Sequence, residues 1–110
     1  RHTRLQGDWS SDVCSSDLDV ATIKPLDSET ILQSVAKTGR CVIVHEAART
    51  AGMGAEVAAE VAERGLLNLL APVRRVAGYD TVMPLYRLEN AYMPDTARIV
   101  TAATETMELA

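Results

Sequence analysis

The expected fold of this chain is decided by residues 40–60, RCVIVHEAARTAGMGAEVAAE. Residues 40–45 include four consecutive apolar side chains, three of them Val or Ile, and this composition is typical of a buried β-strand. Small residues at 46–51 indicate a loop, and the spacing of apolar residues then predicts a helix over about 54–70. Gly65 is expected to break that helix or to end its first part.

The sequence before this stretch predicts one more strand-like run and one helix. Residues 19–23 form a short extended run, which Lys24 ends because the residue before a proline favours extended geometry. Asp27 or Ser28 is suited to cap a helix by accepting a backbone N–H bond, and Gly39 is suited to end it.

The sequence after residue 70 predicts a further strand and a last helix. The strand is expected at 73–77, with the side chains of Arg74 and Arg75 on opposite faces. A turn and an irregular segment follow, and the last helix is expected to start at Pro94-Asp95, with proline at its first position. We expect its inward face to be an apolar stripe of Ile99, Val100, Ala103 and Met107.

Strands and helices therefore alternate along the chain, which predicts a parallel or mostly parallel sheet with helices packed on its faces. The fold class that we expect is α/β, a truncated three-layer α/β/α sandwich. Three strands are few for such a sheet, so we expect further strands upstream of Asp19 in the natural polypeptide.

The first eighteen residues, RHTRLQGDWSSDVCSSDL, differ from the rest because they have no hydrophobic period of either kind. Residues 1–4 and 8–18 resemble the translation of a common sequencing-library adapter, with a short index between them. We therefore expect residues 1–18 to be a non-native, disordered segment and residues 19–110 to be a partial domain. The alternative is a natural polar arm.

The composition of the chain argues against two classes of protein, those that bind nucleic acid and those that span a membrane. The chain has a formal net charge of −4 and a single basic doublet, Arg74-Arg75, which argues against nucleic acid as a partner. It contains no apolar run approaching the roughly eighteen residues of a membrane span. Cys41 lies inside an apolar run, so we expect it to act as a small core residue, and a lone buried thiol agrees with a cytoplasmic location.

Four ordered blocks carry a resemblance to a known family: DVATIKPLD at 19–27, RCVIVHEAARTAGMGAEVAAEVAE at 40–63, APVRRVAGYDTVMPL at 71–85 and YMPDTARIV at 92–100. Together they resemble the C-terminal domain of the transketolase group. The similarity is greatest to the beta subunit of the thiamine diphosphate-dependent decarboxylating component of 2-oxo acid dehydrogenase complexes. The block His45-Glu46-Ala47 favours this subunit over transketolase or deoxyxylulose-phosphate synthase, which remain the first alternative. A stand-alone acidic binding module is the second.

The resemblance implies a role in assembly. The whole enzyme would decarboxylate a 2-oxo acid, such as pyruvate or a branched-chain 2-oxo acid, and pass the acyl group to lipoamide. Thiamine diphosphate and magnesium would be bound elsewhere in the holoenzyme, and this chain alone would be inactive. Its implied partners are a second beta subunit, the alpha subunit and the subunit-binding domain of the acyltransferase.

The chemistry-bearing residues of the central stretch allow a functional and a structural interpretation. His45 and Glu46, at the end of a strand, could form an acid–base pair, or the histidine could be buried with its hydrogen bonds satisfied. Gly52 and Gly54 could cradle an anion or allow close packing. A dinucleotide fingerprint is excluded because Val57 occupies the position of its third glycine.

The remaining candidates lie in or near the predicted loops. Arg49 is expected to pair with Glu46 or with a partner subunit, and Arg75 to form a salt bridge or span an interface. Tyr79 and Asp80 are expected to contact another chain or to pack locally. We therefore expect interface or structural roles for these residues, and no catalytic, cofactor-binding or metal-binding residue in the chain.

Overall fold

Two parallel strands form the middle layer of the protein. In a computed structural model, which describes residues 17–81 and 87–108, β1 (Val42–Ala48) pairs with β2 (Arg74–Gly78). The register joins Val42 to Arg74 and Ala48 to Gly78, with an irregularity between Val44 and Ala48. Since β1 and β2 run in the same direction, the expectation of a parallel sheet is confirmed.

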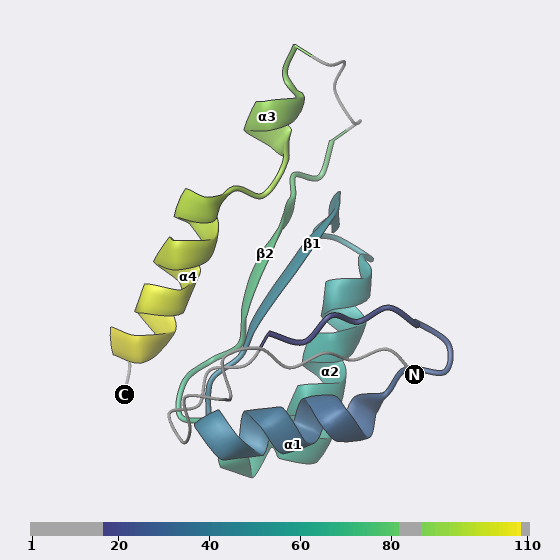
Figure 1. Ribbon diagram of the computed structural model, residues 1–110, viewed down its shortest axis with the longest axis vertical. Helices are drawn as coiled ribbons and strands as arrows, with labels where there is room; N and C mark the ends of the chain where they lie inside the picture. Colours follow the sequence, from purple (N-terminus) through teal and green to yellow (C-terminus); the bar gives the residue numbers. More distant parts are fainter. Residues whose placement is uncertain (1–16, 82–86, 109–110) are drawn as a thin grey trace.

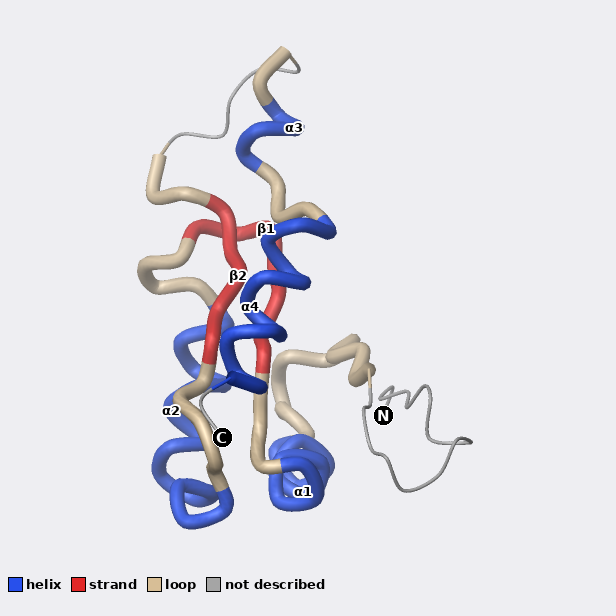
Figure 2. The backbone as a smooth tube through the Cα atoms, turned by 90° about the vertical axis from the view of Figure 1, so that its left-hand side faces the viewer, coloured by secondary structure: helices blue, strands red, loops and turns tan. Residues whose placement is uncertain are grey.

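Helices cover both faces of this sheet (Figures 1 and 2). The helix α2 (Met53–Gly65) packs on one face and α4 (Thr96–Glu108) on the other, while α1 (Ser28–Thr38) packs against α2. Two short helical segments complete the described part, η2 (Leu66–Asn68) and α3 (Glu89–Tyr92). The order helix, sheet, helix is the expected three-layer α/β/α arrangement, with two strands in the residues described.

The prediction of a strand-like run at 19–23 is wrong. Residues 19–22 have no regular structure and a turn follows at 23–26. An extended segment becomes a strand only when a neighbouring strand accepts its backbone hydrogen bonds, and none of the described residues does so here. Of the adapter-like segment, residues 1–16 lie outside the described part of the chain.

The ends of the helices follow local chemistry. Asp27 is the N-cap of α1, where its carboxylate accepts the Thr30 amide at 3.3 Å and the Thr30 hydroxyl at 2.8 Å. Gly39 ends α1 with φ of 77° and donates its N–H to the Val35 carbonyl at 2.7 Å. The helix expected over 54–70 ends at Gly65, as one of the two expectations for that glycine stated.

The hydrophobic core lies between α1, α2 and the sheet. Val61 is completely buried, and Ile31, Val35 and Val57 surround it. Half-buried residues from the strands and loops pack on this cluster: Leu18, Leu26, Leu32, Cys41, Ile43, Leu69 and Val73. Cys41 therefore behaves as the small core residue that the sequence predicted, and burial raises the pKa of its thiol.

The last helix turns a different face to the sheet from the one predicted. Ala102 and Thr106 are buried, whereas Val100 is 55% exposed, Met107 is 63% exposed and Ala103 is exposed. Two arginines explain this orientation, because Arg98 Nη2 donates to the Ala77 carbonyl at 2.7 Å and Arg40 Nε donates to the Thr106 carbonyl at 3.0 Å.

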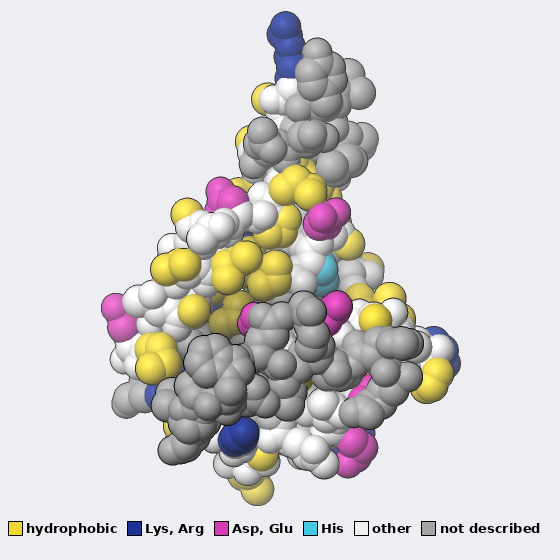
Figure 3. All heavy atoms as spheres, viewed as in Figure 1, with side chains coloured by type: hydrophobic (Ala, Val, Ile, Leu, Met, Phe, Trp, Pro, Cys, Tyr) yellow, Lys and Arg dark blue, Asp and Glu magenta, His cyan; other side chains and the backbone are white. Residues whose placement is uncertain are grey.

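Those two hydrogen bonds place Ala102 and Thr106 against the strands and leave Val100, Ala103 and Met107 outside, whereas Ile99 is half-buried. Figure 3 shows hydrophobic side chains gathered over the region where α4 lies in Figure 1.

The start of α4 also differs slightly from the prediction. The Asp95 carboxylate accepts the Arg98 amide at 2.9 Å, so Asp95 acts as the N-cap and Pro94 precedes the helix. Among the described residues, no helix is long and apolar enough to cross a membrane.

Candidate functional site

The carboxyl ends of β1 and β2 lie side by side, and most of the candidate residues gather there. Ala48 pairs with Gly78, and the Arg49 amide donates to the Gly78 carbonyl at 3.1 Å. β1 therefore continues three residues beyond the predicted end at His45, because its parallel partner supplies hydrogen bonds as far as Gly78. In parallel sheets this edge is where binding sites form.

A carboxylate ties the loop after β2 to the loop after β1. Asp80 Oδ1 accepts the Thr50 amide at 2.9 Å, and Asp80 Oδ2 accepts a short hydrogen bond from the Thr50 hydroxyl. The side-chain bond from Thr50 and then its backbone bond lower the pKa of Asp80, since both favour the charged carboxylate. The pair fixes the relative position of the two loops.

The imidazole of His45 lies against the two glycines of the following loop and helix. His45 Nδ1 lies 3.0 Å from the Ala47 carbonyl oxygen, and since a carbonyl only accepts, we place the ring proton on Nδ1. A Cβ built on Gly54 would lie 2.7 Å from His45 Nε2, and one on Gly52 would lie 2.8 Å from His45 Cε1. Glycine at both positions therefore leaves the space that the ring occupies.

The other nitrogen of this ring, Nε2, is buried and has no hydrogen-bond partner among the described residues. Glu46 is exposed, and as the next strand residue its side chain lies on the opposite face of β1. The sequence pointed to His45, Gly52 and Gly54 separately, but the contact that joins them depends on how α2 folds back onto β1.

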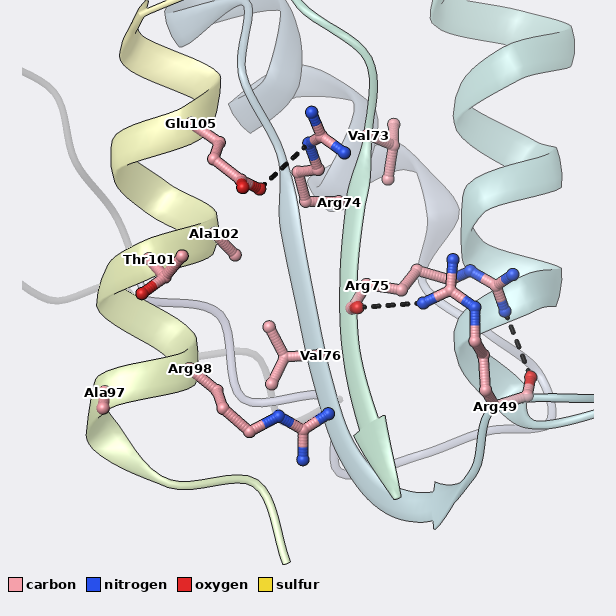
Figure 4. A pocket seen from close by; sticks show the side chains of 10 residues that line it. All are labelled: Arg49, Val73, Arg74, Arg75, Val76, Ala97, Arg98, Thr101, Ala102 and Glu105. Atoms are coloured by element: carbon pink, nitrogen blue, oxygen red, sulfur yellow. Dashed lines mark hydrogen bonds and ion pairs between the residues drawn. The ribbon is translucent and has the colours of Figure 1, made fainter. Parts of the chain in front are cut away.

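Arg49 of the loop and Arg75 of β2 each donate a hydrogen bond to the backbone carbonyl of the other (Figure 4). Arg49 Nη1 donates to the Arg75 carbonyl at 3.2 Å, and Arg75 Nη1 donates to the Arg49 carbonyl at 3.1 Å. Arg49 thus binds the backbone of β2 and not Glu46, the pairing that the sequence suggested within the chain. Arg74 points to the other face, toward Glu105 of α4, so the prediction of opposite faces is confirmed.

Aromatic rings flank the end of β2. The guanidinium carbon of Arg98 lies 4.9 Å from the centre of the Tyr79 ring, and the rings of Tyr79 and Tyr92 meet edge to face with centres 6.4 Å apart. Tyr79 nevertheless remains 53% exposed. Gly78 allows this arrangement because a Cβ there would collide with the Glu46 carbonyl and the Tyr92 ring.

Two clefts of similar size flank the sheet. One, of about 400 Å³, lies along β2 and α4 and contains four arginines, whereas the other, of about 420 Å³, lies along β1 and is lined mainly by apolar side chains. In residues 17–81 and 87–108, no three His, Cys, Asp or Glu side chains meet in a group that could hold a metal ion. The residues described do not fit a magnesium–diphosphate site, and we assign none of them to that cofactor.

Comparison with known proteins gives a family for most of the chain. A family model described as the transketolase C-terminal domain matches residues 18–99. The pyruvate dehydrogenase E1 component subunit beta of Staphylococcus epidermidis is 48% identical over 91 residues, which cover 83% of this chain and 28% of that protein. The subunit of the same name from Staphylococcus aureus shows the same identity and coverage. The chain therefore spans about 28% of the length of the curated relatives that it matches.

Proposed function

The chain belongs to the family of transketolase C-terminal domains, and from this premise we propose that it is the C-terminal assembly domain of the beta subunit of a cytoplasmic 2-oxo acid dehydrogenase. Pyruvate is the 2-oxo acid favoured, because the relatives compared above carry the name pyruvate dehydrogenase. The whole enzyme would decarboxylate the acid with thiamine diphosphate and magnesium and pass the acyl group to lipoamide. This chain would contribute contacts and no bond-making group.

The observation that carries the assembly role is the outward face of α4. Val100, Ala103 and Met107 recur at helical spacing on this helix, yet all three are exposed. An amphipathic helix in a monomer usually buries its apolar stripe, so a stripe left outside indicates a surface that another chain covers. We assign this face to the second beta subunit.

The loops at the carboxyl end of the sheet form a second exposed surface. Glu46, Arg49, Tyr79 and Asp80 are exposed there. Hydrogen bonds hold Arg49 and Asp80 in place, and the Arg98 guanidinium lies over the Tyr79 ring. Their side chains combine charge with one aromatic ring, a composition suited to the polar part of a subunit interface. We propose that the alpha subunit or the subunit-binding domain of the acyltransferase contacts this surface, while His45, Gly52, Gly54 and Arg75 support it from below.

A domain exchange tests the proposal. Residues 19–108 would replace the matched region in the beta subunit of Staphylococcus aureus, which would be co-expressed with its alpha subunit. We expect the chimera to assemble and to decarboxylate pyruvate, as measured by light scattering and by reduction of an artificial electron acceptor. A chimera that is folded but stays dissociated and inactive would refute the assembly role.

A matched pair of variants then tests the surface. In the chimera, Met107→Glu places a charge on the α4 stripe and should weaken assembly by about tenfold or more, because an interface buries that charge without a partner. Leu67→Glu introduces the same charge in η2, at a residue that is 98% exposed, and should leave assembly unchanged. Equal effects of the two substitutions would contradict the assignment of α4.

A further inference from the structure

We propose that the cleft between β2 and α4 binds a small dianion with oxyanion groups at both ends and an apolar middle, of the aliphatic dicarboxylate class. Arg74 and Arg98 would hold the two charged groups. This site does not use the exposed stripe of α4. Arg49, which also lines the cleft, belongs to the loop surface assigned above to subunit contacts.

Two of the arginines bind the edge of β2 that faces away from β1, an edge that pairs with no strand among the described residues. The Arg74 amide donates to the Cys41 carbonyl at 3.1 Å, so the backbone of residue 74 faces β1. Backbone groups alternate between the two edges of a strand, and residues 75 and 77 therefore face the opposite edge. Their carbonyls accept hydrogen bonds from Arg49 and Arg98, at 3.2 and 2.7 Å, which seat two guanidinium groups along this edge.

These hydrogen bonds orient the arginines without neutralising them. A backbone carbonyl carries no net charge, so Arg49, Arg75 and Arg98 keep their full positive charge. Four of the eleven Lys and Arg residues of an acidic chain line the cleft, but only the side chains of Arg74 and Arg98 lie on its α4 side, because those of Arg49 and Arg75 extend toward α2 (Figure 4). Among the described residues Glu105 is the only acid that lines the cleft. With Arg74 and Arg98 against Glu105, the local charge between β2 and α4 is positive, and an anionic ligand would compensate it.

Two of these arginines each have one donor nitrogen without an acceptor in the described part of the chain. Arg74 Nε and Arg98 Nη1 are buried nitrogen atoms that have no hydrogen-bond partner among the described residues. Glu105 Oε1 forms an ion pair with Arg74 Nε at 3.6 Å, a distance too long for a hydrogen bond. A buried donor without an acceptor is costly, and carboxylate oxygens match the guanidinium fork.

The residues that line the cleft between Arg74 and Arg98 indicate the chemistry of the middle part of the ligand. In Figure 4 the guanidinium groups of Arg74 and Arg98 lie toward opposite ends of the cleft, with Val76 and Ala102 between them. Two cationic ends and an apolar middle match a methylene chain with a carboxylate at each end. The cleft volume of about 400 Å³ lies within the range of small-molecule sites.

Calorimetric titration of the 110-residue chain with acetate, succinate and adipate tests the site, with far-UV circular dichroism as the check on folding. The best dicarboxylate should bind at least about tenfold more tightly than acetate, because its second carboxylate binds as an intramolecular step. Dicarboxylates that bind no better than acetate, or an absence of saturable binding, would overturn the proposal.

Three variants assign the binding to the cleft. Arg74→Gln should weaken dicarboxylate binding by about fivefold or more, since it removes a charge-assisted donor. Glu105→Gln should strengthen binding by about threefold, because it removes the one negative charge at this end. Arg64→Gln, which changes the net charge equally on a remote face of α2, should change binding by less than about twofold. Equal weakening by Arg64→Gln and Arg74→Gln would show that the attraction is not local to the cleft.

Discussion

Substitution of Gly54 by alanine tests the contact between His45 and the start of α2. Gly54 lies inside a helix, where alanine is ordinarily better than glycine by about 1 kcal/mol. Here, however, the new Cβ would lie 2.7 Å from His45 Nε2, 2.9 Å from His45 Cδ2 and 3.3 Å from Ile43 Cγ2. Real Cβ atoms do not approach ring atoms this closely, so either the ring or the helix must move.

The geometry decides which effect is larger. The ring of His45 is held by the contact of Nδ1 with the Ala47 carbonyl, and it therefore cannot swing away without losing that hydrogen bond. Overpacking of a rigid site costs up to about 3 kcal/mol, which exceeds the gain in helix propensity. We expect Gly54→Ala to lower the free energy of unfolding by about 2 kcal/mol, or the midpoint of thermal unfolding by about 8–16 °C.

Thermal and urea unfolding, followed by circular dichroism, provide the measurement. Gly65→Ala is the matched control on the same helix, because its Cβ would meet one mobile atom, Leu32 Cδ2, at 3.2 Å. The double variant His45→Ala/Gly54→Ala should be about 3 kcal/mol more stable than the sum of the single effects predicts, since removing the ring removes the whole cost of the collision and leaves the gain in helix propensity. If Gly54→Ala is as stable as the original chain, or if the two sites show no coupling, the proposed steric role is wrong.

Three more outcomes follow from the structure. Thr50→Val should raise the pKa of Asp80 toward its ordinary value, because it removes the hydroxyl bond that lowers this pKa most. The hydrogen bonds to Asp80 stabilise the folded state at pH values above the unfolded-state pKa, and that stabilisation is lost as the pH falls through the folded-state pKa. Carboxyl NMR titration measures the change, and an unchanged pKa would contradict the reasoning. Val61→Ala, at a fully buried site, should lower the free energy of unfolding in urea by about 2 kcal/mol, whereas Leu67→Ala should lower it by less than about 0.5 kcal/mol. Similar losses at the two positions would contradict the described core. Burial raises the pKa of Cys41, so iodoacetamide should alkylate it more slowly than glutathione at mildly alkaline pH, as followed by mass spectrometry; an equal rate would show the thiol to be accessible.

Most residues of the candidate site, but not all, could be predicted from the sequence. The sequence motifs indicated residues that the structure brings to one edge of the sheet, because local sequence is enough to predict strand ends and loops of small residues. It did not identify Thr50, the donor to Asp80, or Arg98, the cation beside Tyr79. Neither residue lies in a pattern that marks it, and each becomes important through a neighbour that is distant in the sequence.

The same division applies to the fold. The sequence by itself determined the end of α1 at Gly39, its start at Asp27 or Ser28, the apolar strand and the order of α1, β1, α2, β2 and α4, since these depend on side chains within a few residues of one another. Only the tertiary structure decided the length of β1 and the face that α4 turns inward. Those outcomes depend on hydrogen bonds between distant residues, such as Arg40 to Thr106, 66 positions apart, which contribute energy only after the sheet has formed.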